Sequence, residues 1–358
     1  MGDDVIVSEA DKPFVETVRI QNFGCARDVT LELTRLHALI GPNDSGKSTV
    51  LEAIRTACEL IRHGEERLSD FVPRDARRQA EAVVTMEWPV RDGRTRIDWL
   101  RTEDYWVFRA EGPVTGGGVV QHDLQHSVPH SFVDPVRGAT MIRWDPDTVR
   151  QPCELVPEGR TLIVSEKGQG IPAVYDAVLS RDREAFDAIE ESVRRHFPTV
   201  RSIWLPTSTN SMKALGVVLK DGTRVRANEL SEGLLYWLAF AILPQVNPTA
   251  FLLVEEPENG LHPSRIAEVV KVLREISKTM QVIIATHSPL VVNELQPNEV
   301  TILIRDEKTG TRAKRMDRTT HFQQRQQVYA LGELWLSFAD GVDEAALVKD
   351  DDAKHPAG

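Results

Sequence analysis

The chain has 358 residues, of which 41% are hydrophobic, so it can fill one large or two ordinary domain cores. Its longest apolar stretch, residues 234–243, is well short of the roughly 20 residues that cross a bilayer, and the first residues lack a basic segment followed by an apolar one. A net charge of −11 argues against a protein coated in positive potential for nucleic acid, although a local basic groove stays open. We therefore expect a cytoplasmic protein without a membrane segment.

Two antiparallel strands are expected near the start, because apolar and polar residues alternate through residues 15–33. A short buried strand follows at residues 36–40, then a turn that contains glycine. Apolar residues next recur at helical spacing over residues 48–62. Strand, glycine loop and helix in this order are typical of a parallel α/β unit.

The composition changes between residues 65 and 205, where proline and glycine recur every few residues and short segments rich in β-forming residues appear. A helix is predicted over residues 181–197, ended by Pro198, and no sustained heptads predict a coiled coil. We interpret this segment as an inserted, mostly β lid region. Residues 216–225 then predict a hairpin that turns at Asp221 and Gly222.

Parallel-sheet character returns in two nearly continuous apolar strands, at residues 250–255 and 281–286. Between them, residues 263–278 carry an apolar helical face, with Pro263 at the first helical position. A hairpin is predicted at residues 299–316 and a helix at residues 326–339. The expected domains are a discontinuous head at 1–64 and 206–320, an inserted region at 65–205, and a C-terminal helix with a flexible tail at 321–358.

A phosphate-binding loop is predicted at residues 41–49, GPNDSGKST, which fit the pattern G-x-x-x-x-G-K-[ST]. The glycines let backbone N–H groups turn toward a polyphosphate, Lys47 supplies a charge for the β and γ phosphates, and Ser48 can hold Mg²⁺. The alternative is a bland glycine turn. The expected nucleotide-binding residues are Gly41, Pro42, Asn43, Asp44, Ser45, Gly46, Lys47, Ser48 and Thr49.

Two acids and a histidine follow the later strands. Glu255 and Glu256 come at the carboxyl end of the first strand, where open α/β sheets bind ligands. We expect Glu255 to orient Mg²⁺ and Glu256 to polarise an attacking water; the alternative is a pair of solvated acids. His287, after the next strand, can reach the γ-phosphate or that water, or it can be a loop histidine bonded to backbone.

A hydroxyl, a charge and a glycine, Ser231, Glu232 and Gly233, precede the most hydrophobic helix of the chain. The N–H groups at a helix N-terminus attract anions, Ser231 adds a donor, and Gly233 permits close approach. Since one phosphate loop already surrounds its own triphosphate, we infer that this segment caps the γ-phosphate bound by a second copy. The alternative is an ordinary helix N-cap.

These elements, in the order GPNDSGKST, LSEG, LLVEEPE and ATHS, resemble the ABC-type ATPase head shared by SMC, RecF and OLD-family proteins, over residues 13–64 and 207–305. The resemblance implies a P-loop α/β head with an N-terminal antiparallel subsheet. It makes Lys47 and Ser48 the Walker A ligands, Glu255 and Glu256 the Walker B pair, residues 231–233 the signature and His287 the switch histidine. It also makes residues 259–262 a loop that faces the dimer partner.

Three departures from transporter ATPases favour an OLD-like protein. The first Walker B acid is Glu255 instead of Asp, EEPENGLHP is similar to the OLD-like pattern, and the signature lacks a second glycine and glutamine. No glutamine is a convincing Q-loop residue, Gln79 included, and Arg27 is a weak candidate for a phosphate-facing arginine. The residues after His287 lack the clustered acids of a toprim nuclease, so the resemblance implies a stand-alone ATPase.

The leading functional hypothesis is a Mg²⁺-dependent ATPase that works as an ATP-dependent homodimer, or a higher-order assembly, and drives a separate effector. That effector could be a nuclease in DNA repair or anti-phage defence, which is an argument by analogy. The alternatives are a slow ATP-locked scaffold and, less favoured, a transporter subunit. DNA stays open as a partner through basic clusters at residues 73–79, 193–197 and 311–318, each of which can equally be a solvated face.

Overall fold

The computed structural model describes most of the chain and divides it into two compact units. The described residues are 14–63, 82–90, 93–101, 106–114, 118–119, 134–209, 211–306, 308–319 and 331–333. Unit 1 contains residues Met1–Ala139 and Gln281–Gly358, and unit 2 contains Thr140–Met280. None of the helices within these described ranges has the length and apolar character needed to cross a membrane.

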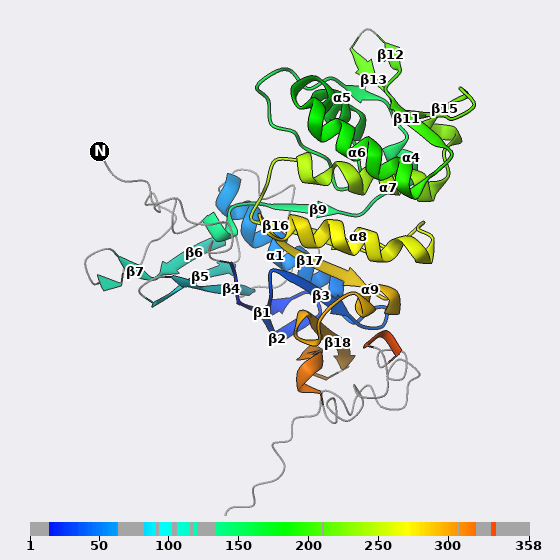
Figure 1. Cartoon of the computed structure of the whole chain (residues 1–358). Coiled ribbons are helices and arrows are strands. Elements are labelled where there is room, and N and C mark those ends of the chain that lie inside the picture. The colour runs from blue at the N-terminus through cyan, green and yellow to red at the C-terminus, as the bar shows by residue number, and fades with distance from the viewer. Residues whose placement is uncertain are drawn as a thin grey trace, which may run out of the picture. The chain divides into compact units, whose positions relative to one another are not determined.

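An antiparallel sheet with the strand order β2-β1-β4-β5-β6 forms one part of unit 1 (Figure 1). Val18 and Ile20 of β1 are buried and alternate with polar residues, as a sheet with one packed face requires. Three strands from the expected insertion extend the two predicted N-terminal strands: β4 pairs with β1, β5 with β4, and β6 with β5. The bounds are β1 Thr17–Phe23, β2 Ala26–Glu32, β4 Val83–Val90, β5 Gly93–Arg101 and β6 Trp106–Glu111, with a small hairpin of β7 Pro113–Val114 and β8 Gly118–Val119.

A mainly parallel sheet forms the other part of unit 1, in the order β19-β18-β3-β17. Strand β3 pairs in parallel with both β17 and β18, and every residue of β3 and β17 is buried. Continuous apolar strands of this kind suit the centre of a parallel sheet. The bounds are β3 Leu36–Ile40, α1 Lys47–His63, β17 Gln281–Thr286, α9 Pro289–Asn293, β18 Val300–Asp306 and β19 Gly310–Arg315.

Unit 2 is built around the apolar helix α7, Glu232–Ile242, which packs against α4, α5, α6 and α8. Its residues 234–240 are all buried, which is expected of a helix that is apolar all round. The helices, grouped in the upper part of Figure 1, are α4 Pro146–Val149, α5 Ile171–Arg181, α6 Arg183–His196 and α8 Pro263–Ile276. The second half of the expected insertion contains α4, α5 and α6 beside short strands, so it is richer in helix than predicted.

Short strands complete unit 2. Strands β16, Phe251–Glu255, and β9, Ala139–Ile142, are neighbours in one sheet. The predicted hairpin turns at Asp221 and Gly222 between β14, Gly216–Leu219, and β15, Arg224–Arg226. Two three-stranded sheets have the orders β11-β14-β15 and β10-β13-β12, in which the remaining strands are β10 Cys153–Glu154, β11 Val200–Trp204, β12 Thr207–Thr209 and β13 Met212–Lys213.

Predicted helix boundaries have visible local causes. Helix α6 ends at His196, two residues before Pro198, and Asp182 caps its start by accepting from Ala185 N at 2.9 Å. Helix α8 begins at Pro263, as predicted, with His262 as its N-cap. The helix predicted at residues 326–339 lies largely outside the described residues, as do the C-terminal tail and Gln79.

Candidate functional site

The predicted phosphate loop joins β3 to α1 in unit 1. Lys47 is the first residue of α1 and is buried, and its Nζ donates to the carbonyl oxygens of Gly41 and Pro42, each at 2.9 Å. Gly41 admits no side chain, because a Cβ there would lie 2.1 Å from the carbonyl oxygen of Leu303. The loop therefore wraps around its own lysine, and bound phosphate would replace these carbonyl contacts.

Small polar side chains of two neighbouring hairpins, β1–β2 and β18–β19, contact this loop. The hydroxyl of Thr311 donates to the carbonyl oxygen of Ser45 at 2.9 Å, and the thiol of Cys25 contacts the Thr49 hydroxyl at 3.3 Å. Gly46 has φ +100°, and a Cβ there would lie 2.3 Å from the Thr311 hydroxyl oxygen. The loop conformation is thus fixed by contacts with β19 and with the turn after β1.

Two serine hydroxyls, one exposed and one buried, mark the loop as a polar site. Ser48, in the first turn of α1, is exposed, as a residue that holds a phosphate-bound metal must be. Ser45 is 1% exposed and its hydroxyl has no hydrogen-bond partner among the described residues. A buried hydroxyl without a partner is costly, and a bound phosphate would supply an acceptor for it.

Glu255 ends strand β16 in unit 2, and its side chain is 11% exposed. Its Oε2 accepts from Nε of Arg143 at 2.6 Å. Its Oε1 is buried and has no partner among the described residues. A buried carboxylate oxygen that lacks a protein donor is the kind of group that a bound cation satisfies.

Glu256 has a left-handed backbone, with φ +46°, directly after the strand. Its carboxylate accepts from the Nδ2 of Asn259 at 2.5 Å. Such a conformation costs on the order of 1 to 3 kcal/mol in a non-glycine residue and is found chiefly at functional sites. The two adjacent acids therefore have different partners, Arg143 for Glu255 and Asn259 for Glu256.

The predicted signature forms the start of α7, and Ser231 is its N-cap. The Ser231 hydroxyl accepts from Leu234 N at 3.4 Å, so the ordinary capping role is present. A Cβ on Gly233 would lie 3.3 Å from the carbonyl oxygen of Gly260, and one on Gly260 would lie 2.4 Å from the ring of Tyr236. The two glycines therefore let the signature and the 259–262 turn lie against each other.

Tyr236 lies in the second turn of helix α7, and its ring packs against Gly260 of the 259–262 loop. Burial, and then the charge of Glu232, raises the pKa of Tyr236 to about 12. The phenol is therefore neutral at physiological pH, and it has the role of a packing surface for Gly260 instead of an acid or a base.

His287 follows β17 in unit 1, at the carboxyl end of a fully buried strand. The turn that carries it is defined by the Thr286 hydroxyl, which accepts from Ser288 N at 2.9 Å. Other predicted residues have structural partners: Arg27 donates to the carbonyl oxygen of Lys308, and Arg315 binds Asp317 at 2.7 Å and Glu32 at 3.1 Å. The basic cluster at residues 311–318 is thus partly neutralised within the chain.

Sequence reasoning missed Arg143 as a partner of the metal-site acid. Arg143 is the first residue after β9, and β9 lies beside β16. The available signal was a charged residue at the end of a short apolar segment, but only the strand order shows which acid it meets.

Magnesium fits the residues that the structure describes. No group of three or more His, Cys, Asp or Glu in the described part of the chain is arranged to hold a metal unaided. A Mg²⁺ ion shared with nucleotide phosphates needs only one or two protein ligands. Each unit offers one suitable ligand atom: the hydroxyl of the exposed Ser48 in unit 1, and the orphaned Oε1 of Glu255 in unit 2.

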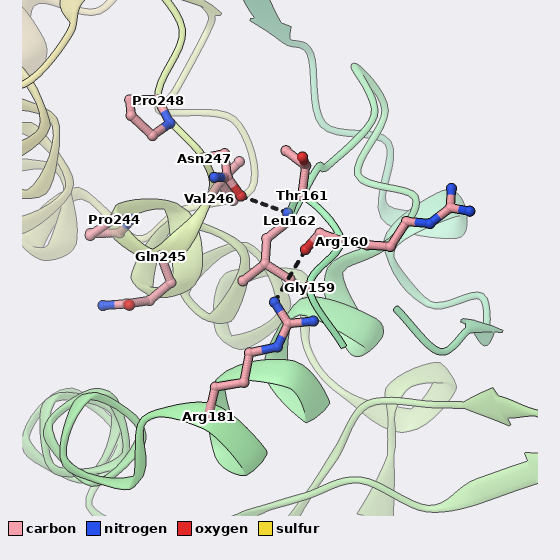
Figure 2. A pocket seen from close by; sticks show the side chains of 10 residues that line it. All are labelled: Gly159, Arg160, Thr161, Leu162, Arg181, Pro244, Gln245, Val246, Asn247 and Pro248. Carbon is pink, nitrogen blue, oxygen red and sulfur yellow. Dashed lines mark hydrogen bonds between the residues drawn. The ribbon is translucent and has the colours of Figure 1, made fainter. Parts of the chain in front are cut away.

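A separate pocket of about 460 Å³ lies in unit 2 between residues 159–162 and 244–248 (Figure 2). Arg181 points into it but donates to the carbonyl oxygens of Arg160 at 3.2 Å and Pro157 at 2.9 Å. Asn247 accepts from Leu162 N at 2.6 Å. Both side chains therefore bind backbone atoms of residues 157–162, and the pocket contains none of the predicted site residues.

Two family models match the chain. Residues 14–60, which include the phosphate loop, match an AAA ATPase domain. Residues 123–293, which include Ser231, Glu255 and His287, match the model described as "AAA domain, putative AbiEii toxin, Type IV TA system".

Known proteins add a sequence relative and two structural neighbours. The OLD nuclease of Thermus scotoductus is 30% identical over 90 residues, which are 24% of this chain and 17% of that protein. An SMC head bound to the C-winged helix domain of ScpA is 14% identical, with a TM-score of 0.59 over 84% of this chain and 97% of the other. An SMC head with an extended coiled coil, from the Pyrococcus furiosus complex, is 13% identical, with a TM-score of 0.54 over 88% and 100%.

The solved structures show the fold, an α/β head of the ABC and SMC type, and the family models supply the activity. Two stretches of the chain therefore match AAA ATPase domains, the fold is that of an SMC-type head, and a short part of the sequence is similar to an OLD nuclease.

Proposed function

We propose that the chain hydrolyses ATP with Mg²⁺, and that its head is formed by residues 1–64 and 206–320. Residues 41–49 cradle the phosphates, and Lys47 neutralises the β and γ phosphates. Ser48 and Glu255 hold Mg²⁺, Glu256 polarises the attacking water, and His287 binds the γ-phosphate or that water. The orphaned Oε1 of Glu255 and the buried, unpartnered Ser45 hydroxyl support these assignments.

The ATPase site is completed by a second copy of the chain. The observation that supports this step is the N-terminus of α7: Ser231 and Glu232 are exposed, although the helix that follows is buried. Its N–H groups and the Ser231 hydroxyl form an anion site, and Gly233 keeps the approach clear. In this proposal ATP joins two copies, with Lys47 from one and Ser231 from the other.

The test is the size of the protein in solution with ATP, with ADP and without nucleotide, measured by light scattering. The Glu256→Gln variant with ATP is expected to form a stable dimer, because it binds ATP but hydrolyses it slowly. Adding Lys47→Ala to that variant is expected to abolish the dimer. A monomer in every condition, with ATP shown to be bound, would contradict the composite site.

A slow, ATP-locked scaffold is the second candidate, and the bond between Glu256 and Asn259 favours it. At 2.5 Å this bond engages the carboxylate that has to polarise water. Measurement of the pre-steady-state burst separates the two: sustained turnover supports a motor, whereas one ATP hydrolysed per site and then retained supports a scaffold. Asn259→Ala is expected to raise turnover if this bond limits it.

The partner that we propose is a separate effector protein, such as a nuclease, in DNA repair or anti-phage defence. The similarity to an OLD nuclease and to an AbiEii-type AAA domain supports this class of role. DNA contact would show as binding that weakens as salt rises. The test is co-expression with the product of the neighbouring gene, for which the ATP-bound Glu256→Gln dimer is expected to retain more partner than the ADP form.

A further inference from the structure

Arg143 and Glu255 form an ion pair in unit 2 that no catalytic assignment above uses. Strand β9 ends one residue before Arg143 and β16 ends at Glu255, and the two strands are neighbours. The Nε of Arg143 lies 2.6 Å from Oε2 of Glu255. The two side chains therefore meet at the same sheet edge that offers Glu255 to a metal.

Glu166 anchors the arginine on its other side. The backbone N–H of Arg143 donates to the carbonyl oxygen of Glu166 at 2.8 Å, and its Nη1 lies 3.6 Å from the Glu166 carboxylate. The guanidinium is thus held from two directions, and its orientation toward Glu255 does not depend on one contact alone.

The pairing is asymmetric in a way that suits a metal ligand. Arg143 donates to Oε2, while Oε1 is buried and has no partner among the described residues. The arginine side chain is 46% exposed and the glutamate side chain only 11%, so the arginine approaches Glu255 from the solvent side. A purely structural arginine pair would commonly use both carboxylate oxygens.

We propose that Arg143 is a positioning residue for the Mg²⁺ site: it holds Oε2 so that Oε1 is presented to the metal. The inference rests on the proposed function, because it assumes that Glu255 serves Mg²⁺. Groups that hydrogen-bond a metal-ligating carboxylate fix its orientation, and their loss typically weakens metal affinity by about 10- to 100-fold.

The test measures metal binding directly. Mn²⁺ is titrated into the whole chain with bound non-hydrolysable ATP analogue, and free Mn²⁺ is followed by electron paramagnetic resonance. Arg143→Ala is expected to raise the dissociation constant for Mn²⁺ by at least about 10-fold. Binding of the analogue in EDTA is expected to stay within about 2-fold of wild type, because the arginine acts through the metal ligand.

Two further variants sharpen the test. Arg143→Lys keeps a charge but not the planar donor geometry, so an intermediate loss of about 3-fold or more is expected, and this variant carries the test if Arg143→Ala does not fold. Arg183→Ala removes an exposed ion pair with Asp187 on α6 and is expected to leave Mn²⁺ binding unchanged.

Unchanged Mn²⁺ affinity in both Arg143 variants would overturn the inference, and so would tighter Mn²⁺ binding, which would show that Arg143 competes with the metal. Glu255→Gln separates this failure from that of the proposed function. If Glu255→Gln weakens Mn²⁺ binding and the Arg143 variants do not, only the positioning role is wrong. If Glu255→Gln has no effect, the metal assignment itself is wrong.

Discussion

Gly46, in the phosphate loop, is required by both its backbone and its neighbours. Its φ of +100° is in the left-handed region, and a Cβ would lie 2.3 Å from the Thr311 hydroxyl oxygen and 2.9 Å from the Cys25 sulfur. Gly222 has a similar φ of +90°, but a Cβ added there would meet no heavy atom within 4 Å. Both glycines have a left-handed backbone, but only Gly46 is crowded. Comparing substitutions at the two positions therefore separates the cost of crowding from the cost of backbone strain.

We predict that Gly46→Ala lowers the free energy of unfolding by about 3 kcal/mol and abolishes ATP binding, since backbone strain and crowding add. Gly222→Ala is the matched control, with an expected cost of about 1 kcal/mol and normal ATP binding. Urea unfolding and nucleotide titration check both. Equal costs for the two variants would contradict the role of the hairpin contacts.

His37, within the apolar strand β3, makes stability depend on pH. It is fully buried, its Nε2 bonds to the Thr301 hydroxyl at 2.8 Å, and burial, followed by the charge of Arg315, lowers its pKa to about 3. The unfolded chain binds a proton near pH 6.5, but the folded chain does not until about pH 3. Well above pH 6.5, neither state binds this proton and the stability does not depend on it. Below pH 6.5 the unfolded chain takes up the proton and the folded chain does not, so the free energy of unfolding falls as the pH falls.

We predict that wild-type protein loses stability faster than His37→Gln as the pH falls from 6.5 to 4. The difference in their unfolding free energies should change by about 1.4 kcal/mol per pH unit in this window and stay constant above about pH 7. Urea unfolding at half-unit pH intervals measures it. Parallel pH profiles would show that the buried imidazole is not the cause.

At the scale of elements, Ser231 at the start of α7 has two roles that substitutions can separate: it caps the helix, and it is proposed to bind the phosphate held by a second copy. Aspartate caps a helix as well as serine does, but it places a negative charge where the phosphate of the second copy is proposed to bind. We predict that Ser231→Asp keeps wild-type thermal stability and loses ATP-dependent dimerisation. Ser231→Ala is expected to lose about 1 kcal/mol of stability. A Ser231→Asp dimer of wild-type affinity would refute the shared site.

Several elements could be predicted from sequence because their causes are local. The spacing of apolar residues and the glycine pattern predict β3, the phosphate loop and α1, and a single proline predicts the start of α8. The Asp221–Gly222 hairpin follows from turn chemistry. Each of these patterns spans only a short stretch of the sequence, so it can be recognised without knowing the fold.

The features that sequence could not supply depend on distant pairings or on unusual backbone. Strand β4 pairs with β1 across about 60 residues, and no local pattern encodes that register. The partner of Arg143 follows from the order of β9 and β16. The left-handed backbone of Glu256 has no signal in its residue type, since glutamate rarely adopts it.

At the scale of the whole molecule, nucleotide should stabilise the fold by mass action. At a concentration 100 times the dissociation constant, Mg·ATP is expected to add about 2.7 kcal/mol and to raise the melting temperature by about 5 °C. We predict that Lys47→Ala removes this shift. Lys271→Ala, which removes an exposed pair with Glu268 on α8, is the control and should retain it. A full shift in Lys47→Ala would contradict the assigned phosphate loop.

The position of β3 between β17 and β18 has a consequence for protein synthesis. The strand that leads into the phosphate loop is made early, but its two neighbours emerge from the ribosome about 240 residues later. At a synthesis rate of roughly 5 to 20 residues per second, the apolar strand β3 lacks its neighbouring strands for on the order of 10 to 50 s. A chaperone that shelters the nascent N-terminal segment during this interval should therefore raise the yield of active ATPase.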